Sequence, residues 1–331
     1  MTGPALSVVV PSHDRPLRLR WLLNALADQT LDRDAFEVIV AHDSRGPETD
    51  ALLAAHPLTA AGVLRALAFD AGTAGPAQKR NAAWRAARAP HVLFTDDDCR
   101  PPREWLEHAL AAVRARPDAI VQGPTQIDPD ELVVKLHAPH ARTQVVELVG
   151  GQASIWAQTC NIAYPRAVLA ACDGFDDALP VAAGEDTDLA WRAREQGVEM
   201  VGAPAMLTFH CVEPATLVAR ARESWRWQHL PYLTRKHPEI RRSYAGGGWF
   251  WKPQHTKVPF LLLAATLLLR GRPAAALVAT VPWAAGSMPG YGSSWRGRAR
   301  AVSELPGSAV LDVVEVAALA RGSVRHRSLL L

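Results

Sequence analysis

Residues 91–98 read HVLFTDDD, a short apolar run that ends directly in three aspartates. Valine, leucine and phenylalanine in a run of this length indicate a buried β-strand. Two other runs end in the same way: residues 6–11 (LSVVVP) lead to Asp14, and residues 36–41 (FEVIVA) lead to Asp43. Ligands of open α/β sheets bind outside the carboxyl ends of the strands. We therefore expect these carboxylates to meet in one crevice.

Helical patterns separate these strands. Leucines between residues 19 and 26 follow the spacing of one helix face, and two further amphipathic segments cover residues 77–87 and 105–113. Pro76 suits the first turn of the helix expected over residues 77–87. The alternation of strands with helices predicts βαβ units. The expected fold class is therefore α/β, with a Rossmann-type, mostly parallel sheet covered by helices on both faces.

The composition is that of a folded, globular protein. Hydrophobic residues make up 49% of the 331 residues and charged residues 21%. The net charge of +3 is small for this length, so we expect no nucleic-acid partner. The four cysteines lack the spacing of a disulfide framework or a zinc site, which favours buried thiols in a reducing compartment. The first residues lack the pattern of an export signal, which predicts a cytoplasmic protein.

The last third of the chain has a different character. Basic residues outnumber acidic ones after Arg220, and two apolar runs, residues 258–269 and 274–285, flank the sequence RGRP. Twelve helical residues span about 18 Å, which is short of the ~30 Å hydrocarbon core of a bilayer. Two interpretations stay open: a hairpin that lies in or re-enters the membrane interface, or a hairpin buried in a soluble domain. The first would make the protein peripheral on the cytoplasmic face of the membrane.

The aspartate triplet is the strongest single chemical signal. Asp96, Asp97 and Asp98 repel one another unless a cation compensates them. Oxygen ligands suit Mg²⁺ or Mn²⁺, which take their remaining ligands from phosphates and water. The alternative is a solvated acidic turn. His210 follows a later apolar stretch and could complete the metal shell, although a lone histidine is more often an ordinary hydrogen-bonded residue.

Two predicted helix starts carry further chemistry. Residues 184–189 (GEDTDL) place Asp186 and Asp188 in a first turn, where an ionised carboxylate can accept a proton from an attacking hydroxyl. Ordinary helix capping is the alternative. Residues 75–81 (GPAQKRN) open a helix with two cations, which can hold a diphosphate. A solvated basic face is the alternative there.

Taken in order, these segments resemble the family 2 glycosyltransferases with the GT-A fold. The resemblance is carried by SVVVPSHDRPLRLRWLLNALADQT near the N-terminus, then FEVIVAHDS, AGPAQKRNAAWRAA, HVLFTDDDCRPP, CNIAYPRAVLAACDGFDDAL and GEDTDLAWRAREQG. It covers residues 6–210 and leaves residues 211–331 largely outside. It implies an enzyme that moves a sugar from a nucleotide-diphosphate donor to an acceptor hydroxyl, with inversion and with a divalent metal, Mn²⁺ or Mg²⁺.

The resemblance also implies a division of the chain. Residues 1–213 would form the GT-A domain, with a nucleotide-binding half over residues 1–125 and an acceptor half over residues 126–213. Residues 214–331 would form a helical extension that contains the apolar hairpin over residues 258–286. The basic, apolar character of this extension favours a lipid-linked or cell-envelope glycan as the acceptor and a membrane surface as a partner.

By this resemblance, each residue of the site has an expected role. The residues expected at the start of the catalytic helix are Asp186 as the base, Asp188 as the alternative base, and Glu185. The residues expected at the nucleotide are Pro11, Ser12, Asp14, Arg15, Asp43, Lys79, Arg80, Asn81, Asp96 and Asp97. The residues expected at the sugar and acceptor are Asn161, Gly174, Phe175, Asp176, Trp191 and Arg192. The expected metal ligands are Asp98, Asp96 and His210.

Two positions depart from the family pattern. His42 stands where the second strand-end motif often has an acid, and Asp14 stands where asparagine is usual after the first strand. Both bear on the choice of base, and a UDP-sugar is the expected donor. Three alternatives stay open: a nucleotidyltransferase, which the glycine-free segment PSHDRP disfavours, an inactive nucleotide-sugar-binding protein, and a membrane-associated adaptor.

Overall fold

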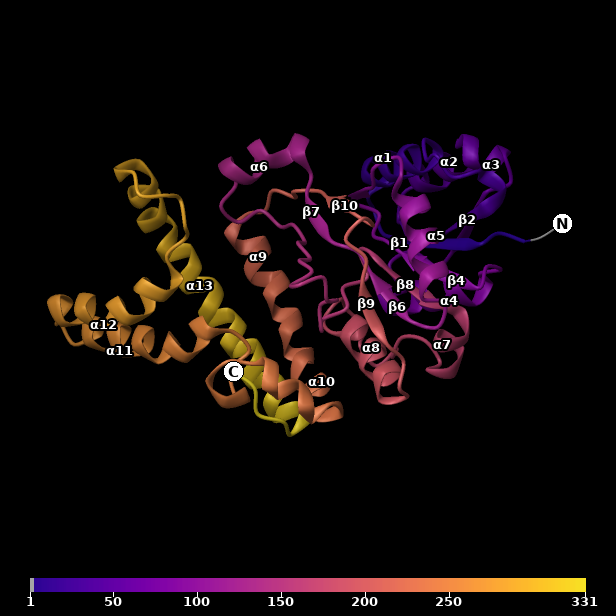
Figure 1. Cartoon of the computed structure of the whole chain (residues 1–331). Helices are drawn as coiled ribbons and strands as arrows, with labels where there is room; N and C mark the ends of the chain where they lie inside the picture. The colour runs from indigo at the N-terminus through magenta and orange to yellow at the C-terminus, as the bar shows by residue number, and fades with distance from the viewer. Residues whose placement is uncertain (1–2) are drawn as a thin grey trace. The chain divides into compact units, whose positions relative to one another are not determined.

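The computed structural model describes residues 3–331. The chain forms two compact units, and each is described by itself (Figure 1). The N-terminal unit comprises Met1–His137 and Ala141–Pro214, and the C-terminal unit comprises Ala138–His140 and Ala215–Leu331.

Two sheets form the framework of the N-terminal unit. The larger one has seven strands in the order β3-β2-β1-β4-β8-β6-β9. Its strands are β1 (Leu6–Ser12), β2 (Phe36–His42), β3 (Leu64–Ala68), β4 (His91–Phe94), β6 (Ile120–Gln122), β8 (Ile162–Pro165) and β9 (Met200–Gly202). The smaller sheet, in the order β5-β10-β7, consists of β5 (Cys99–Arg100), β7 (Thr125–Ile127) and β10 (Thr208–His210). In the large sheet β8 runs antiparallel to both neighbours, and the other neighbouring strands are parallel.

Helices cover both faces of the large sheet. The helices of this unit are α1 (Pro16–Ala27), α2 (Pro47–Ala55), α3 (Pro57–Ala60), α4 (Pro76–Ala86), α5 (Trp105–Ala115), α6 (Leu132–His137), α7 (Arg166–Ala171) and α8 (Glu185–Glu195), with short 3₁₀ turns η1 (Arg33–Ala35) and η2 (Pro129–Glu131). Alternate residues of β1 point to opposite sides, as the pleat of a strand requires. Val8 and Val10 pack in one cluster with α1, α2, α3 and α5, whereas Val9 packs in the other with α4, α7 and α8. The predicted α/β class, with helices on both faces, is confirmed.

The strand register places the ends of three strands side by side. Leu6 of β1 lies opposite Phe36 of β2 and His91 of β4. Ser12, the last residue of β1, lies opposite His42, the last residue of β2. Because the strands are parallel, the polar residues that follow each of them emerge at the same edge of the sheet.

The C-terminal unit is helical. Its elements are α9 (Leu217–Ser224), η3 (Trp225–His229), α10 (Leu230–Lys236), η4 (Pro238–Ser243), η5 (Gly246–Gly248), η6 (Pro253–Lys257), α11 (Val258–Leu269), α12 (Pro273–Ser287) and α13 (Trp295–His326). The long helix α13 packs against α9, η3 and α10, and α11 packs against α12. No helix in the described part of the chain is both long enough and apolar enough to cross a membrane.

The sequence patterns over residues 215–241 and 312–320 each predict one helix, and the structure differs from both in extent. The pattern over residues 215–241 suggests one helix, but the structure divides it into α9, η3, α10 and η4. Pro231 lies in the first turn of α10 and Pro238 begins η4, because proline cannot donate the backbone hydrogen bond that a continuous helix needs. The helix expected near Asp312 is longer than its apolar pattern, because Ser294 caps its start by accepting a hydrogen bond from Gly297 N at 3.1 Å.

A buried polar cluster joins α9, η6 and α13. Glu315 of α13 accepts a hydrogen bond from Lys252 Nζ at 2.6 Å and lies 3.2 Å from His255 Nε2. Ser224 donates to its second oxygen at 3.3 Å. Burial alone would raise the pKa of Glu315, but His255 and Lys252 outweigh it and lower the pKa to about 2. The cluster therefore carries its own cation and ties three segments together at neutral pH.

Candidate active site

Asp97 is the buried centre of the acidic triplet after β4. Ser12 Oγ, at the end of β1, donates a hydrogen bond to Asp97 Oδ2 at 2.7 Å. Arg15 Nη1 approaches Asp97 Oδ1 at 3.3 Å. Burial and the neighbouring charge of Asp98 raise the pKa of Asp97 to about 7, against the opposing effect of Arg15. These contacts bring together Ser12, Arg15 and Asp97, three residues that the sequence predicts for one site.

Arg15 connects three segments of the N-terminal unit. Its guanidinium donates to Asp98 Oδ2 at 2.7 Å and to Glu213 Oε2 at 3.1 Å. Burial would lower the pKa of Arg15, but Asp97, Asp98 and Glu213 outweigh it and raise the pKa. Glu213 also accepts a hydrogen bond from Arg142. Sequence reasoning missed Glu213; the signal was its place three residues after His210, at the end of another strand.

Asp98 and His210 have the properties of metal ligands. Asp98 is 7% exposed, and its Oδ1 atom has no hydrogen-bond partner among the described residues. His210 Nε2 lies 3.4 Å from that atom, and the thiol of Cys211 belongs to the same cluster. Burial would raise the pKa of Asp98, but His210 and Arg15 outweigh it and lower the pKa. A carboxylate and an imidazole suit a divalent ion such as Mn²⁺, so the residues fit the predicted metal.

Cys211 and Asp96 change the predicted ligand set. Cys211 was missed, although it adjoins His210 in the sequence. Burial raises the pKa of the Cys211 thiol, which keeps it protonated and makes it a weak ligand. Asp96 was expected as a ligand, but its Oδ1 accepts a hydrogen bond from Arg80 at 2.9 Å. Asp96 also lies outside the cluster formed by Asp98, His210 and Cys211.

Arg80 is a buried cation held between two carboxylates. Its guanidinium donates to Asp96 Oδ1 and to Glu185 Oε1, each at 2.9 Å, and lies 5.7 Å from the ring of Phe175. Burial would lower the pKa of Arg80, but Asp96 and Glu185 outweigh it and raise the pKa. Arg80 was expected along the diphosphate. In the structure it fixes the end of β4 against the start of α8, and Glu185 serves as its partner rather than as a base.

Asp186 keeps the geometry expected of a base, whereas Asp188 does not. Burial, followed by the charge of Glu185, raises the pKa of Asp186 to about 8. Asp186 is partly exposed and accepts a hydrogen bond from Thr187 N at 2.7 Å. Asp188 is fully buried and forms an ion pair with Arg192 Nε at 2.8 Å. This burial and ion pair make Asp186 the better placed of the two, and the role of Asp188 as an alternative base stays a prediction.

Arg192 and Asn81 hold the segment around Gly174. Arg192 donates to the carbonyl oxygens of Cys172 and Gly174. Asn81 donates to the carbonyl oxygen of Phe175 at 2.8 Å and accepts from Phe175 N at 2.9 Å. Gly174 has a φ of +69°, and a Cβ there would lie 2.3 Å from Asn81 Oδ1. Arg192 and Asn81 were expected at the acceptor and the nucleotide; the structure shows their bonds to this segment, and both roles stay predictions.

Asn161 also holds distant segments together. Its side chain is completely buried. It accepts a hydrogen bond from Trp105 Nε1 at 2.9 Å and donates to the carbonyl oxygens of Pro124 and Met206, at 2.8 Å and 2.5 Å. With its amide satisfied inside the protein, Asn161 joins α5 to the loops around β7 and β10, and its contact with the sugar stays a prediction.

Asp43, at the end of β2, is buried in a group of donors. Lys79 Nζ donates to its Oδ1 at 2.6 Å, and His13 Nδ1 lies 2.8 Å from the same oxygen. Ala74 N donates to Oδ2 at 3.2 Å, and Lys79 also donates to the carbonyl of Ser12 at 3.0 Å. Burial would raise the pKa of Asp43, but Lys79 and His13 outweigh it and lower the pKa. Lys79 is thus bound to a protein carboxylate, and Asp43 Oδ2 keeps one lone pair.

The remaining expected residues lie around these groups. Pro11 is buried in β1 opposite Ala41. Asp14 has a φ of +50° and accepts a hydrogen bond from Arg45 N at 2.7 Å, which ties the loops after β1 and β2 together. Asp176 accepts from Ala178 N at 2.9 Å. Trp191 stacks under Arg194 at 5.3 Å. None of these contacts assigns a ligand to the residue concerned.

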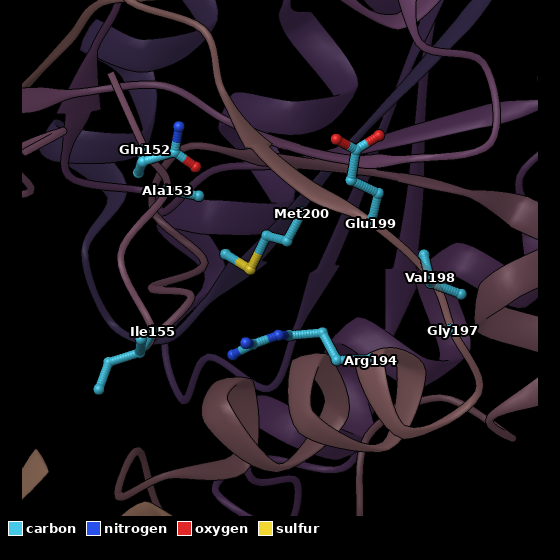
Figure 2. Close-up of a pocket in the computed structure, with 8 residues that line it drawn as sticks. All are labelled: Gln152, Ala153, Ile155, Arg194, Gly197, Val198, Glu199 and Met200. Atoms are coloured by element: carbon cyan, nitrogen blue, oxygen red, sulfur yellow. The ribbon is translucent and has the colours of Figure 1, made fainter. Parts of the chain in front are cut away.

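A cavity of about 360 Å³ lies elsewhere in this unit (Figure 2). Its walls come from residues 152–155, from Arg194 near the end of α8, and from residues 197–200. Residues 197–200 precede or begin β9, which is parallel to β6, so the cavity lies at the amino ends of the parallel strands. It contains none of the predicted site residues and is not the candidate active site.

Comparison with known proteins places this geometry in context. The model described as Glycosyl transferase family 2 matches residues 7–169. The chain is 30% identical over 107 residues to poly(ribitol-phosphate) beta-N-acetylglucosaminyltransferase TarS of Staphylococcus aureus, over 32% of this chain and 18% of that protein. It is 26% identical over 265 residues to validoxylamine A glucosyltransferase of Streptomyces hygroscopicus, over 72% of this chain and 62% of that protein. The chain thus spans less than two thirds of the length of these relatives.

Solved structures show the fold. The mannosyltransferase PcManGT of Pyrobaculum calidifontis, in complex with GDP-Man and Mn²⁺, has a TM-score of 0.58 at 20% identity, over 99% of this chain and 88% of that chain. Residues 1–349 of TarS in complex with UDP have a TM-score of 0.54 at 15% identity, over 98% and 92% of the two chains. The likeness is to GT-A glycosyltransferases, so the predicted fold family is confirmed.

Proposed function

Because residues 7–169 belong to glycosyl transferase family 2, we propose that the chain transfers a sugar from a nucleotide-diphosphate donor to an acceptor hydroxyl. The observation that carries the proposal is the linkage of residues from the ends of β1 and β4, and from α4 and α8, into one polar group. Ser12 and Arg15 contact the aspartates after β4, and Arg80 joins Asp96 to Glu185 beside Asp186.

The surroundings of Asp43 favour a uridine donor. Lys79 and His13 occupy Oδ1, and Ala74 takes one lone pair of Oδ2. One acceptor position is left, which matches the single imide N–H of uracil. Guanine presents two adjacent N–H groups and needs both oxygens of a carboxylate. A UDP-sugar is therefore the proposed donor, although one structural neighbour is a complex with GDP-Man.

Asp98 and His210 are the proposed ligands of a divalent ion, Mn²⁺ or Mg²⁺. When bound, such an ion neutralises charge on the leaving diphosphate. Arg15 holds Asp98 in place from the other side through Oδ2 and is itself fixed by Glu213. Ser12 donates a hydrogen bond to Asp97, and Asp97 in turn accepts one from Arg15, so these residues help to hold Arg15 beside Asp98.

Asp186 is the proposed general base. The anomeric carbon of the donor gains a bond to the acceptor oxygen as its bond to the diphosphate oxygen breaks. The hydroxyl proton moves to the Asp186 carboxylate, and the configuration at the anomeric carbon inverts. Arg80 positions Glu185, whose charge helps to raise the pKa of Asp186 to about 8 and thereby strengthens it as a base.

The acceptor is proposed to be a lipid-linked or cell-envelope glycan. The support is the basic, apolar C-terminal unit, which suits an anionic, membrane-borne substrate.

The test of the proposed reaction is product formation from a panel of UDP-, GDP- and dTDP-sugars, with donor hydrolysis followed where no acceptor is known. We expect turnover with a UDP-sugar and a loss of about 10²–10⁴-fold in Asp186→Asn. Asp173→Asn is the matched control, because Asp173 is an exposed carboxylate that is not among the predicted site residues. Near-normal turnover by Asp186→Asn would remove the base assignment. Nucleotide-sugar binding without turnover by the wild type would favour an inactive binding protein.

A further inference from the structure

The hairpin of α11 and α12 in the C-terminal unit buries very little of its surface. In α11 only Val258 and Ala264 are buried, and in α12 only Ala276 and Trp283. Trp283 Nε1 donates to Asp312 Oδ2 at 2.8 Å, which fixes α12 to α13. The hairpin is therefore attached to the unit along a narrow stripe, and most of each helix has no protein cover within that unit.

The uncovered surface is almost entirely apolar. In α11, Leu263 is 50% exposed, Leu268 61% and Leu269 90%; in α12, Leu277 is 72% exposed and Val278 70%. In α11 these side chains lie all round the helix instead of on one face. A helix that is apolar all round belongs in a protein core or in lipid, and an exposed patch of this kind marks an interaction site.

The two threonine hydroxyls within the hairpin are satisfied without water. The hydroxyl of Thr266 donates to the carbonyl of Leu262 at 2.8 Å, and that of Thr280 donates to the carbonyl of Leu277 at 2.6 Å. Each bond lies within its own helix. The middle of the hairpin can therefore leave water without losing a hydrogen bond.

Both ends of the hairpin are cationic. Arg270 and Arg272 stand at its turn, and neither forms an ion pair within the described chain. Lys257 lies at the other end of the hairpin. Its Nζ is close to Gly286 near the end of α12, since a Cβ added to that glycine would lie 2.2 Å from it. Residues 240–303 contain no aspartate or glutamate, and residues 215–331 contain 17 lysines and arginines against five acidic residues. The partner of this surface must therefore tolerate, or prefer, a strong positive charge.

We propose that this hairpin is a membrane-docking element that lies parallel to the surface of an anionic lipid bilayer, buried in one leaflet just below the headgroups. The helices would be about 18 and 22 Å long, too short for the ~30 Å hydrocarbon core. Insertion with the turn leading would carry Arg270 and Arg272 into hydrocarbon, which is costly. In the flat orientation the leucines enter the acyl boundary, while Arg270, Arg272 and Lys257 reach the headgroups.

A second copy of the chain is a poorer occupant. Two such units carry the same strong positive charge and repel each other. A flat protein partner would cover one side of the hairpin only, whereas lipid can surround side chains that point in several directions. The inference does not depend on the proposed reaction, since docking needs neither donor nor metal.

The test is co-sedimentation of the full chain with vesicles, without nucleotide. One set contains phosphatidylcholine alone and the other equal parts of phosphatidylcholine and phosphatidylglycerol. We expect binding to the anionic set, weakened at least about tenfold in the triple variant Leu263→Gln/Leu268→Gln/Leu269→Gln. Arg270→Gln/Arg272→Gln should weaken it by about fivefold for each arginine lost.

The matched control is Leu132→Gln/Val133→Gln/Leu136→Gln, which removes three similarly exposed apolar side chains from α6 of the N-terminal unit. It should bind as the wild type does, and circular dichroism should show that every variant is folded. The proposal is overturned if the wild type binds neither vesicle set, or if the control loses as much binding as the hairpin variant. It is also overturned if light scattering shows a dimer that the leucine substitutions dissociate, because the hairpin would then serve a second copy.

Discussion

The protonation of Asp186 determines the pH at which the proposed base can act. Burial and the charge of Glu185 raise its pKa to about 8, so the carboxylate is mostly protonated at pH 7. With that pKa, about a tenth of the molecules have the basic form at pH 7 and about nine tenths at pH 9. We therefore expect kcat/KM to fall as the pH drops below 8 and to rise about tenfold between pH 7 and pH 9.

The assay is kcat/KM for donor consumption against pH in the wild type and three variants. The rise of kcat/KM centred near pH 8 is called the limb of the pH profile. Asp186→Asn should lose this limb along with most of the activity. Glu185→Gln should move that limb to lower pH, because it removes the second cause of the raised pKa. Glu195→Gln, at the far end of α8, is the matched control and should leave the limb unchanged.

Asp97 also titrates within this range, with a pKa of about 7. A limb near pH 7 that remains in Asp186→Asn therefore belongs to Asp97. A limb near pH 8 that remains in Asp186→Asn, or that does not move in Glu185→Gln, would refute the assignment of the base.

Three further predictions concern stability. Gly174→Ala should destabilise the N-terminal unit by at least about 1–3 kcal/mol in denaturant unfolding, because its φ is +69° and its Cβ would meet Asn81; an unchanged midpoint would contradict this. Asp43→Asn should cost about 3–5 kcal/mol in the same assay, since it leaves the buried Lys79 ammonium without its carboxylate; Asp173→Asn, on an exposed carboxylate, is the control. Glu315→Gln should cost about 2 kcal/mol at pH 7. The folded pKa of Glu315 is about 2 and the unfolded value is 4.5, so this contribution is present above pH 4.5 and is lost as the pH falls toward 2. In thermal unfolding, the difference in Tm between the wild type and Glu315→Gln should be smaller at pH 3 than at pH 7. An equal difference at both pH values would contradict this prediction.

The fold was accessible from the sequence because its signals are local. The apolar runs before Asp14, Asp43 and Asp96 each form a strand, and parallel pairing brings their ends to one edge. The family resemblance is confirmed by the match over residues 7–169. The division into nucleotide-binding and acceptor halves stays a prediction.

Side-chain direction was harder to predict than strand position. Asp186 and Asp188 are two residues apart in α8, and two helical steps turn a side chain by roughly 200°, so they point to opposite sides. Asn81 and Asn161 are polar residues within family motifs, but both hydrogen bond to backbone that is distant in sequence. Motif position alone could not distinguish a ligand contact from such a scaffold bond.

Residues brought in by long-range pairing were missed. Glu213 and Cys211 follow β10, whose partners β5 and β7 lie about a hundred residues earlier in the chain. No local pattern predicts that pairing, so the contacts of Glu213 with Arg15 and of Cys211 with Asp98 became visible only in the folded chain.

The central claim is a metal-dependent nucleotide-sugar site built on Asp98. Calorimetric titration of UDP with and without Mn²⁺ tests it most directly, on the wild type, on Asp98→Ala and on the exposed control Asp173→Ala. We expect UDP binding that needs Mn²⁺ in the wild type and the control and that disappears in Asp98→Ala. Equal binding with and without Mn²⁺, full binding by Asp98→Ala, or no binding of UDP, GDP or dTDP by the wild type would contradict it.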